Sequence, residues 1–449
     1  MNKRGNPEKA VPTVIPRKAH NVSRDEISTS ALKVLYRLHK AGHQSFLVGG
    51  SVRDALLGLH PKDFDIATDA HPEEIRALFG NCRLIGRRFR LAHIRFGKEI
   101  IEVATFRAAS IADEGEQADP DHASDHRGRI LRDNVYGTIE EDVFRRDFTC
   151  NALYYNIADF SIWDFVGGVE DIKRRRLALI GDPDRRFRED PVRMLRAVRF
   201  AAKLDFRIDK KVATAIAKDR ELLSNVPAAR LFDELLKLFQ AGQAKKTFEL
   251  LWKHRLFDPL FPETAAELEK SEAFGRFVKS ALINTDKRVA AGKSVTPMFL
   301  LGVFFWEPVR RLAEEMRARE KMSESQSLSL AAYEIVGRQQ SRISIPRRFA
   351  TPMRDMLAMQ PRLDVMKGKR GLNLLDHRRF RAAYDFLMLR AEAGDVDAET
   401  AEFWTRVQKQ SAAERRASFQ VQESKQRNNR GGRRRRPRRR RGPQAAGQS

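Results

Sequence analysis

Residues 47–68 have the sequence LVGGSVRDALLGLHPKDFDIAT, and this stretch is the most informative about the fold. Its apolar start runs into Gly49 and Gly50, which predicts a short strand that ends in a tight turn. The residues after the glycine pair predict a helix that stops at Gly58. The apolar residues at 62–68 predict a second strand. The stretch therefore predicts a strand, a helix and another strand in close succession.

Two aspartates mark the second of these strands. Side chains alternate along a strand, so Asp63 and Asp65 point to one face while Phe64 and Ile66 point to the other. Neighbouring carboxylates repel each other and call for a cation, and hard oxygen ligands favour Mg²⁺. Taken alone, the pair would also fit an edge strand with outward-facing acids.

The residues before the aspartates supply groups that suit a phosphate. Gly49 and Gly50 let backbone N–H groups at a helix start approach an anion, and Arg53 can hold a triphosphate. With Asp63 and Asp65 as metal ligands, these are the parts that metal-assisted phosphoryl transfer requires. The combination favours a functional site over a plain edge strand.

Glu102 is a further candidate metal ligand. It lies in the apolar run EIIEVATFR (99–107), between Ile101 and Val103. A lone carboxylate in an apolar strand is costly unless it is paired or bound to a metal. An ion pair at the strand edge explains it equally well, so both interpretations stay open.

The order of the local patterns predicts an α+β protein. Strand and helix signals mix over residues 44–107, with a tight hairpin through Gly97 and Lys98, which indicates a mixed, mostly antiparallel sheet in an N-terminal head. Beyond Gly181, helical patterns dominate to about residue 410. We therefore expect a catalytic head followed by an all-helical region.

Several segments are expected to lie outside this core. Residues 1–24 read as a flexible basic arm, residues 108–129 as a flexible insertion, and residues 411–449 as a disordered Arg-rich tail. One helix is expected over TIEEDVFRRDFTCNALY (138–154), whose first and fourth residues form a capping box.

The charge of the chain points to a polyanionic partner. Lys and Arg number 85 against 60 Asp and Glu, a net charge of +25, and eleven basic residues without an acid lie from Lys425 onward, which leaves +14 on residues 1–424. Nucleic acid is the expected partner, with an anionic membrane surface contacted through the tail as the alternative. We expect the tail to tether RNA.

The remaining composition suggests a reducing compartment. Cys82 and Cys150 are too few for a disulfide framework. The start of the chain lacks a signal-peptide pattern, and the longest uncharged apolar run, at 294–306, is too short to span a membrane. We therefore expect a cytoplasmic protein.

Three motifs together resemble the class II nucleotidyltransferases, the family of bacterial poly(A) polymerases and tRNA CCA-adding enzymes. They are the stretch at 47–68, RRDFTCNALYY at 145–155 and EDPVRMLRAVRF at 189–200. NCRLIGRRFRLAHIRFG, at 81–97, is similar to the segment that marks the poly(A) polymerases. The chain is thus identified as a member of the bacterial poly(A) polymerase branch, with the CCA-adding enzymes as the alternative.

The resemblance implies an activity and its partners. It implies template-independent transfer of AMP from ATP to RNA 3′-ends with release of pyrophosphate, at a site with two Mg²⁺ ions. Messenger and other RNAs would be the substrates, marked for processing or decay, and RNA-decay proteins are candidate partners. A non-catalytic RNA-binding adaptor is the rival from another class, but it would not need paired acids beside a phosphate loop.

The resemblance also implies roles for residues outside the first motif. Asp147 would be a further active-site carboxylate, and Arg145 and Arg146 would lie near the nucleotide or the RNA phosphate. The domain order would be a head over residues 25–180, a helical neck over 181–255 and a body and leg over 256–410.

The third motif is where the base would be read. Asp190 stands directly before Pro191, which predicts a helix N-cap, and Arg193 and Arg196 follow on adjacent helix turns. An Asp can accept from an exocyclic amine, and an Arg can donate to ring acceptors, so together they suit one edge of adenine. An amphipathic helix with merely stabilising ion pairs is the other interpretation. The resemblance favours base reading by all three residues.

Overall fold

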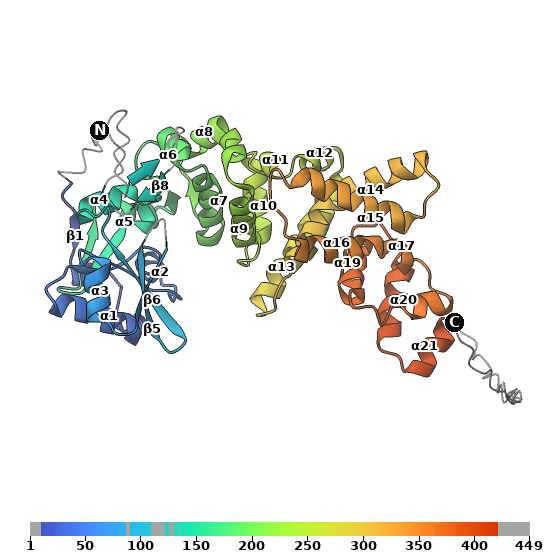
Figure 1. Cartoon of the computed structure of the whole chain (residues 1–449), viewed down its shortest axis with the longest axis horizontal. Coiled ribbons are helices and arrows are strands. Elements are labelled where there is room, and N and C mark those ends of the chain that lie inside the picture. Colours follow the sequence, from blue (N-terminus) through green and yellow to red (C-terminus); the bar gives the residue numbers. More distant parts are fainter. Residues whose placement is uncertain (1–9, 87–89, 109–121, 125–129, 134, 421–449) are drawn as a thin grey trace, which may run out of the picture.

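The structure is a computed structural model that describes residues 10–86, 90–108, 122–124, 130–133 and 135–420. Figure 1 shows a head with all the strands of the large sheet at one end of the molecule and helices along the rest of the long axis. Among the described residues, no helix has the length and apolar character needed to cross a membrane.

An eight-stranded sheet forms the head. In sheet order its strands are β1 (Thr13–Ile15), β10 (Ile162–Asp164), β9 (Leu153–Asn156), β2 (Ser45–Val48), β3 (Asp65–Thr68), β6 (Glu99–Thr105), β5 (Leu91–Phe96) and β4 (Cys82–Ile85). All neighbours are antiparallel except β3 and β6. The expected α+β head with a mixed, mostly antiparallel sheet is confirmed.

The helices of the head surround this sheet. They are α1 (Thr29–Lys40), α2 (Gly50–Leu56), α3 (Pro72–Leu78), α4 (Ile139–Arg145) and α5 (Gly168–Lys173). The core forms because β2 is buried along its whole length and α1 packs its apolar stripe on the sheet. The expected turn after β5 is also present, with Gly97 at a φ of 60° before β6.

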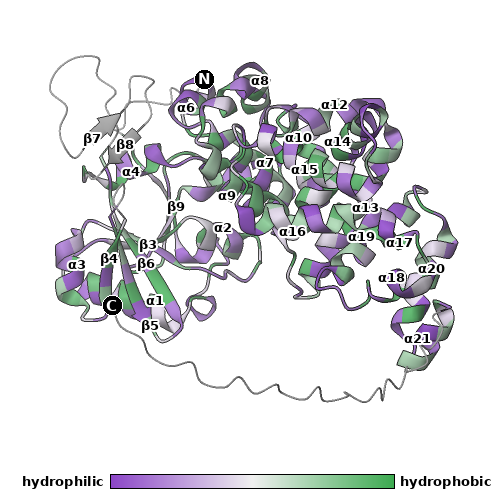
Figure 2. Ribbon diagram, turned by 45° about the vertical axis from the view of Figure 1, so that its right-hand side comes forward, coloured by the Kyte–Doolittle hydropathy of each residue, from purple (hydrophilic) through white to green (hydrophobic). Residues whose placement is uncertain are grey.

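The rest of the chain is helical, as expected. It comprises α6 (Pro183–Glu189), α7 (Val192–Leu204), α8 (Lys210–Asp219), α9 (Ala228–Phe239), α10 (Ala244–Lys253), α11 (Phe257–Leu260), α12 (Pro262–Lys270), α13 (Glu272–Ala290), α14 (Pro297–Arg319), α15 (Glu324–Gln339), α16 (Arg347–Ala358), α17 (Gln360–Leu363), α18 (Gly368–Leu372), α19 (Phe380–Glu392), α20 (Ala398–Gln408) and α21 (Ala412–Ser418). Hydrophobic and hydrophilic residues alternate around these helices in Figure 2. A short parallel pair, β11 (Arg176–Leu177) with β12 (Arg207–Ile208), joins the head to this region.

We expected residues 1–24 to form a flexible arm, and this prediction is wrong for residues 10–24, which the structure describes. Residues 13–15 form the edge strand β1 on β10, and His20 Nε2 lies 2.9 Å from the carbonyl oxygen of Phe160. The physical reason is that β10 offers unpaired backbone groups, which a segment of β-branched residues satisfies. Residues 1–9 lie outside the described part of the chain.

We expected a single helix over residues 138–154, and this prediction is wrong beyond Arg145. The capping box opens α4 as expected, with Thr138 Oγ1 accepting from the Glu141 N–H, but the helix ends at Arg145 and the chain enters β9 at Leu153. Tertiary pairing decides this, because β9 is needed between β2 and β10 and its apolar residues are buried there.

The insertion expected without regular structure also contains strands. Residues 122–124 form β7, which pairs antiparallel with β8 (Ile130–Asp133). Residues 109–121 and 125–129 lie outside the described residues.

The tail begins later than the sequence indicated. Residues 411–420 were expected to be disordered, but α21 forms there with a capping box in which Glu414 Oε2 accepts from the Ser411 N–H at 2.7 Å. Phe419 is fully buried, 5.1 Å from the Phe403 ring and 5.5 Å from the Trp404 ring. The aromatic contact explains why this segment folds back on α20, and residues 421–449 lie outside the described part.

A substitution tests this packing. Phe419→Ala should lower the free energy of unfolding by about 3 kcal/mol, because it leaves a cavity between two aromatic rings. Chemical denaturation of the full chain measures the change. Arg416→Ala, on the exposed side of the same helix, is the control and should change stability by less than about 0.5 kcal/mol. Equal stability of both variants would contradict the packing.

Candidate active site

The glycine turn brings the first motif to the edge of the acid strand. Val48 pairs with Asp65 across β2 and β3, so Gly49 leaves the sheet beside Asp65. Gly49 has a φ of 74°, a left-handed conformation that favours glycine, and its N–H donates to the Leu153 carbonyl at 3.3 Å. A Cβ at this position would lie 3.7 Å from Arg146 Nη1. The turn thus packs against the second motif.

Two segments, β3 with the residues before it and β6, bring three carboxylates to this edge. Asp65 lies beside Glu102 in the parallel register of β3 and β6, and Asp63 comes just before β3. Burial raises the pKa of Asp65 above its usual value, and the negative charges of Glu102 and Asp63 raise it further, while Arg146 opposes them. The expected alternation of buried and exposed residues around Phe64 is confirmed.

Glu102 has a second neighbour that the sequence did not indicate. His93, opposite it on β5, places Nε2 3.3 Å from Glu102 Oε1, close enough for an ion pair when the imidazole is protonated but outside hydrogen-bond geometry. Both interpretations of Glu102, the metal ligand and the strand ion pair, thus find a neighbouring group in the structure.

The carboxylates suit a magnesium ion only together with a substrate. Among the described side chains, no three His, Cys, Asp or Glu residues are close enough to enclose a metal ion. Mg²⁺ in nucleotide sites is usually held by one or two carboxylates, with substrate phosphates and waters completing the shell. Asp63 and Asp65 supply such oxygen donors, and the raised pKa of Asp65 reflects a negative charge that a cation would stabilise. The residues therefore fit the group.

Arg53 is buried rather than open to a ligand. Its side chain donates to Asp54 Oδ1 through Nε at 2.8 Å and to Asn151 Oδ1 through Nη1 at 2.5 Å, and the residue is 2% exposed. Its Nη2 would lie 3.4 Å from a Cβ on Gly50. Arg53 therefore links α2 to the second motif beneath the glycine turn. Its expected contact with a triphosphate stays a prediction.

Asn151 links the motifs, a role that no sequence pattern indicated. It accepts from Arg53 and donates through Nδ2 to Asp147 Oδ1 at 3.4 Å. Asp147 Oδ2 in turn accepts from Arg196 Nε at 2.7 Å and Nη2 at 2.5 Å. Although burial alone would raise the pKa of Asp147, the Arg196 contacts and hydrogen bonds hold it below its usual value. One hydrogen-bonded chain thus joins all three motifs, and Arg196 contacts Asp147 within it.

Arg146 is held against the glycine turn by two partners. Its Nη2 donates to Asp142 Oδ2 at 2.9 Å and its Nε to the Tyr154 hydroxyl at 2.7 Å, while that hydroxyl donates to the same Asp142 oxygen at 2.6 Å. Burial alone would lower the pKa of Arg146, but these contacts raise it above its usual range. The guanidinium therefore keeps its charge and its place beside Gly49.

The third motif is anchored to the second through the buried Arg186. Arg186 Nη2 donates to the carbonyls of Arg145 at 2.7 Å and Arg146 at 2.6 Å, and its Nη1 donates to Glu189 Oε2 at 2.7 Å. The same Glu189 oxygen accepts from Arg193 Nη1 at 2.8 Å. Neither Arg186 nor Glu189 was identified from the sequence, yet they position the predicted base reader.

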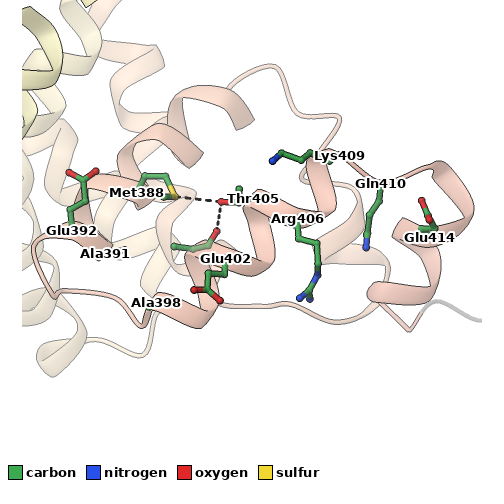
Figure 3. A pocket seen from close by; sticks show the side chains of 11 residues that line it. Met388, Ala391, Glu392, Ala398, Glu402, Thr405, Arg406, Lys409, Gln410 and Glu414 are labelled. Atoms are coloured by element: carbon green, nitrogen blue, oxygen red, sulfur yellow. Dashed lines mark hydrogen bonds between the residues drawn. The ribbon is translucent and has the colours of Figure 1, made fainter. Parts of the chain in front are cut away.

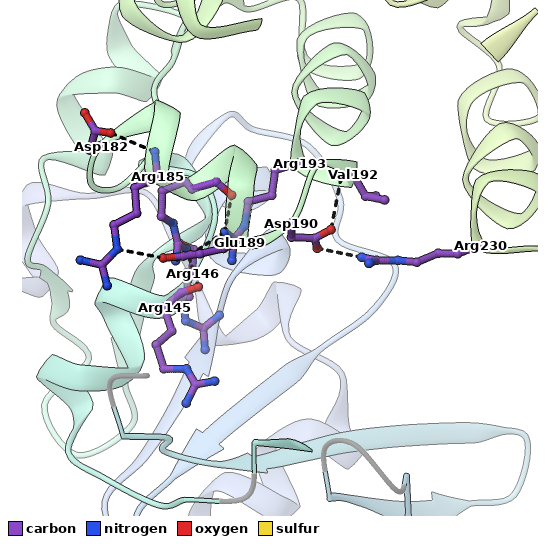
Figure 4. Close-up of polar contacts among 10 residues, drawn as sticks. Arg145, Arg146, Asp182, Arg185, Glu189, Asp190, Val192, Arg193 and Arg230 are labelled. Carbon is purple, nitrogen blue, oxygen red and sulfur yellow. Dashed lines mark hydrogen bonds and ion pairs between the residues drawn. The ribbon is translucent and has the colours of Figure 1, made fainter. Parts of the chain in front are cut away.

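Asp190 lies at the junction of α6 and α7 and is not the N-cap that we expected. The helix starts at Val192 with Pro191 before it, although Asp190 Oδ1 still accepts from the Val192 N–H at 3.2 Å. Its other oxygen accepts from Arg230 Nη2, on α9, at 2.7 Å. Figure 4 shows Arg230 reaching Asp190 from the next helix.

Positive charge is concentrated around Arg145. Burial first, and then the neighbouring cations of Arg107, Arg186 and Arg193, lower the pKa of Arg145 to about 9. The guanidinium remains protonated at neutral pH, so the lowered pKa reports that its charge is poorly solvated and repelled. A bound polyanion would relieve this repulsion.

Comparison with known proteins agrees with this arrangement. Three family descriptions match the chain: "Poly A polymerase head domain" over residues 45–178, "Probable RNA and SrmB- binding site of polymerase A" over 205–268, and "Polymerase A arginine-rich C-terminus" over 320–441. The solved Bacillus stearothermophilus CCA-adding enzyme in complex with CTP covers 86% of this chain and 82% of its own, with a TM-score of 0.54 at 24% identity. Fold and site therefore define a class II nucleotidyltransferase.

Sequence identity separates the two branches of this class. The chain is 49% identical to Poly(A) polymerase I of Escherichia coli O157:H7, over 85% of this chain and 82% of that protein. The CCA-adding enzyme of Lactobacillus helveticus is 34% identical over 58% of this chain and 62% of its own length. The chain belongs to the bacterial poly(A) polymerase family, whose members are polynucleotide adenylyltransferases.

The link between the motifs can be tested at Asn151. Asn151→Ala should lower kcat/KM for AMP incorporation about 100-fold, because Asp147 and Arg53 lose their shared partner and the site shifts. Primer extension at limiting ATP measures this. Asn156→Ala, at the end of β9, is the control, since among the described residues its side chain accepts only from the Ala158 N–H at 3.0 Å. A similar kcat/KM in both variants would contradict the linking role.

Proposed function

We propose that this chain adds AMP from ATP to RNA 3′-ends at the edge of β3, with Asp63 and Asp65 as the metal-binding pair. One observation carries the proposal: Asp63, Asp65 and Glu102 lie at the sheet edge beside Gly49, where burial first, and then the charges of Glu102 and Asp63, raise the pKa of Asp65. Carboxylates kept close at such a cost are typical of sites that bind a cation. Mg²⁺ bound there supplies charge neutralisation and activation of the attacking 3′-hydroxyl.

The chain's own residues hold the triphosphate. Arg146 is fixed beside Gly49 by Asp142 and Tyr154, so its guanidinium is oriented before ATP arrives. Arg145 adds a poorly solvated cation to the same part of the head. Ordered cations of this kind stabilise negative charge without reorganising during the reaction. We infer that these two arginines, rather than the buried Arg53, contact the phosphates.

The base is read by Asp190 and Arg193. Among the described residues, each Asp190 oxygen has one hydrogen-bond partner and one remaining lone pair, so it can also accept from the exocyclic amine of adenine. Arg193 uses Nη1 for Glu189 and the Arg186 carbonyl, and its other nitrogens have no hydrogen-bond partner among the described residues. We infer that Arg193 donates these nitrogens to ring acceptors of adenine.

Asp147 and Arg196 act as positioning residues in this proposal. Their ion pair connects the second motif with α7, which carries Arg193. The contact fixes the base-reading helix relative to the acids of the head. Glu102 remains a candidate for a supporting metal ligand, through its place beside Asp65.

The acid pair gives the first test of this mechanism. Asp63→Ala and Asp65→Ala should each lower AMP incorporation at least about 1,000-fold, because phosphoryl transfer depends on the metal for charge neutralisation. Extension of a labelled RNA with ATP and MgCl₂ measures incorporation, and RNA affinity should stay within twofold. Asp69→Ala, an exposed acid just after the same strand, should leave the rate unchanged. Near-wild-type incorporation by either pair variant would overturn the assignment.

A separate-nucleotide assay tests the product. With ATP alone we expect long adenylate tails on any RNA with a free 3′-hydroxyl, because Asp190 and Arg193 select adenine. A tRNA lacking its terminal CCA is the matched substrate, offered with ATP or CTP separately. Incorporation of CTP that stops after two additions would instead support CCA addition.

A further inference from the structure

A basic cavity lies far along the chain from the motifs, where α13, α14 and α19 meet. It has a volume of about 530 Å³. Its charged lining residues are Lys287, Arg288, Arg378, Arg379, Arg381, Asp385 and Glu392. The head site uses none of these residues, so the cavity needs its own explanation.

Three of the cations are not compensated by an acid. Arg381 pairs with Asp385 at 3.0 Å and Arg378 with Asp355 at 3.5 Å. Among the described residues, the other cations have no carboxylate partner; they are Lys287, Arg288 and Arg379. This unpaired trio gives the cavity a local excess of positive charge, which favours an anionic ligand.

One member of the unpaired trio is partly desolvated. Arg379 Nε is buried and has no hydrogen-bond partner among the described residues. A buried donor without a partner adds to the cost of burying this charged group, which an anion bound in the cavity would offset. Arg379 directly precedes α19, whose first turn also lines the cavity through Ala382.

The cavity also has an apolar wall that suits a base. Phe299, Met298 and Met388 line it. Phe299 is only partly buried, and its ring meets Phe386 edge-on at 6.0 Å, so the ring stays in place. An aromatic side chain next to cations is the usual arrangement for stacking a base of single-stranded nucleic acid.

The walls are held by the preceding helices. Asp286, one residue before the cations of α13, accepts from the backbone N–H groups of Ala244 at 2.6 Å and Lys245 at 3.1 Å. Gln240 Nε2 donates to the Val295 carbonyl at 2.8 Å on the other side. The cavity is therefore built into the junction between α9, α10 and the C-terminal helices.

A neighbouring cavity gives a useful contrast. Figure 3 shows it along α19, α20 and α21, with a volume of about 660 Å³. Its acids Glu392, Glu402 and Glu414 offset Arg406 and Lys409. Without a positive excess it does not suit an anion.

We propose that the basic cavity binds one nucleotide of the RNA strand, upstream of the 3′-end, with a phosphate on the unpaired trio and the base against Phe299. This inference rests on the proposed function only in taking RNA as the polymer. The cavity would hold the growing strand while its 3′-end occupies the head. A short primer held in the head alone would not reach it, because the two sites lie in different parts of the elongated molecule (Figure 1).

The test removes two of the exposed cations in the full chain. Lys287→Ala with Arg288→Ala should weaken binding of a long oligoadenylate about tenfold and lower its salt slope by about 0.7, as expected for one lost phosphate contact on a single strand. Fluorescence anisotropy without ATP measures both. Arg276→Ala with Lys279→Ala removes the same charge from exposed positions of α13 outside the cavity and should change binding by less than twofold. Equal losses in the two variants would overturn the proposal.

Two further readouts complete the test. Extension of a triadenylate primer should be unchanged in the variant with Lys287→Ala and Arg288→Ala. Failure of the unaltered chain to extend this primer would count against the proposed function alone.

Photolysis of a long oligoadenylate containing 8-azidoadenosine should label the peptide that contains Phe299. No label there, or equal labelling by 8-azido-ATP alone, would overturn the assignment to RNA.

Discussion

The contact on which the rest of the site depends is the hydrogen-bonded chain from Arg53 through Asn151 and Asp147 to Arg196. Its members come from the glycine motif, the segment between α4 and β9, and the helix α7. Because every link is at least partly shielded from water, breaking one leaves charged groups without their partners, at a cost well above that of a surface contact. The geometry of the head and of the base-reading helix is therefore set together.

The head contains one cluster of acidic side chains and one cluster of basic side chains. At the edge of β3, burial and the neighbouring acids together raise the pKa of Asp65, which suits a cation. Around Arg145 and Arg186, cations are gathered and buried so that both pKa values fall, that of Arg186 to about 10. Both groups are unfavourable in the free protein, and under the proposed function a metal-bound triphosphate between them would relieve the repulsion.

Sequence patterns predicted the local parts of the site well. The alternation around Phe64 put Asp63 and Asp65 on one face because a strand has a period of two residues, and this needs no knowledge of neighbours. The capping box at Thr138 likewise depends on four consecutive residues. The same reasoning failed after Arg145, where a helix was expected and the sheet instead drew Leu153 into a central strand.

The sequence alone was enough to predict the glycine pair, the acid pair and the order of the three motifs. It also predicted an α+β head followed by a basic, helical region. Which of these groups are buried against one another became clear from the packing of the elements. Arg53 is buried against Asn151, and Arg230 reaches Asp190 from another helix. Such pairings join residues far apart in the chain, and no periodicity or spacing encodes them, because they depend on how whole elements pack.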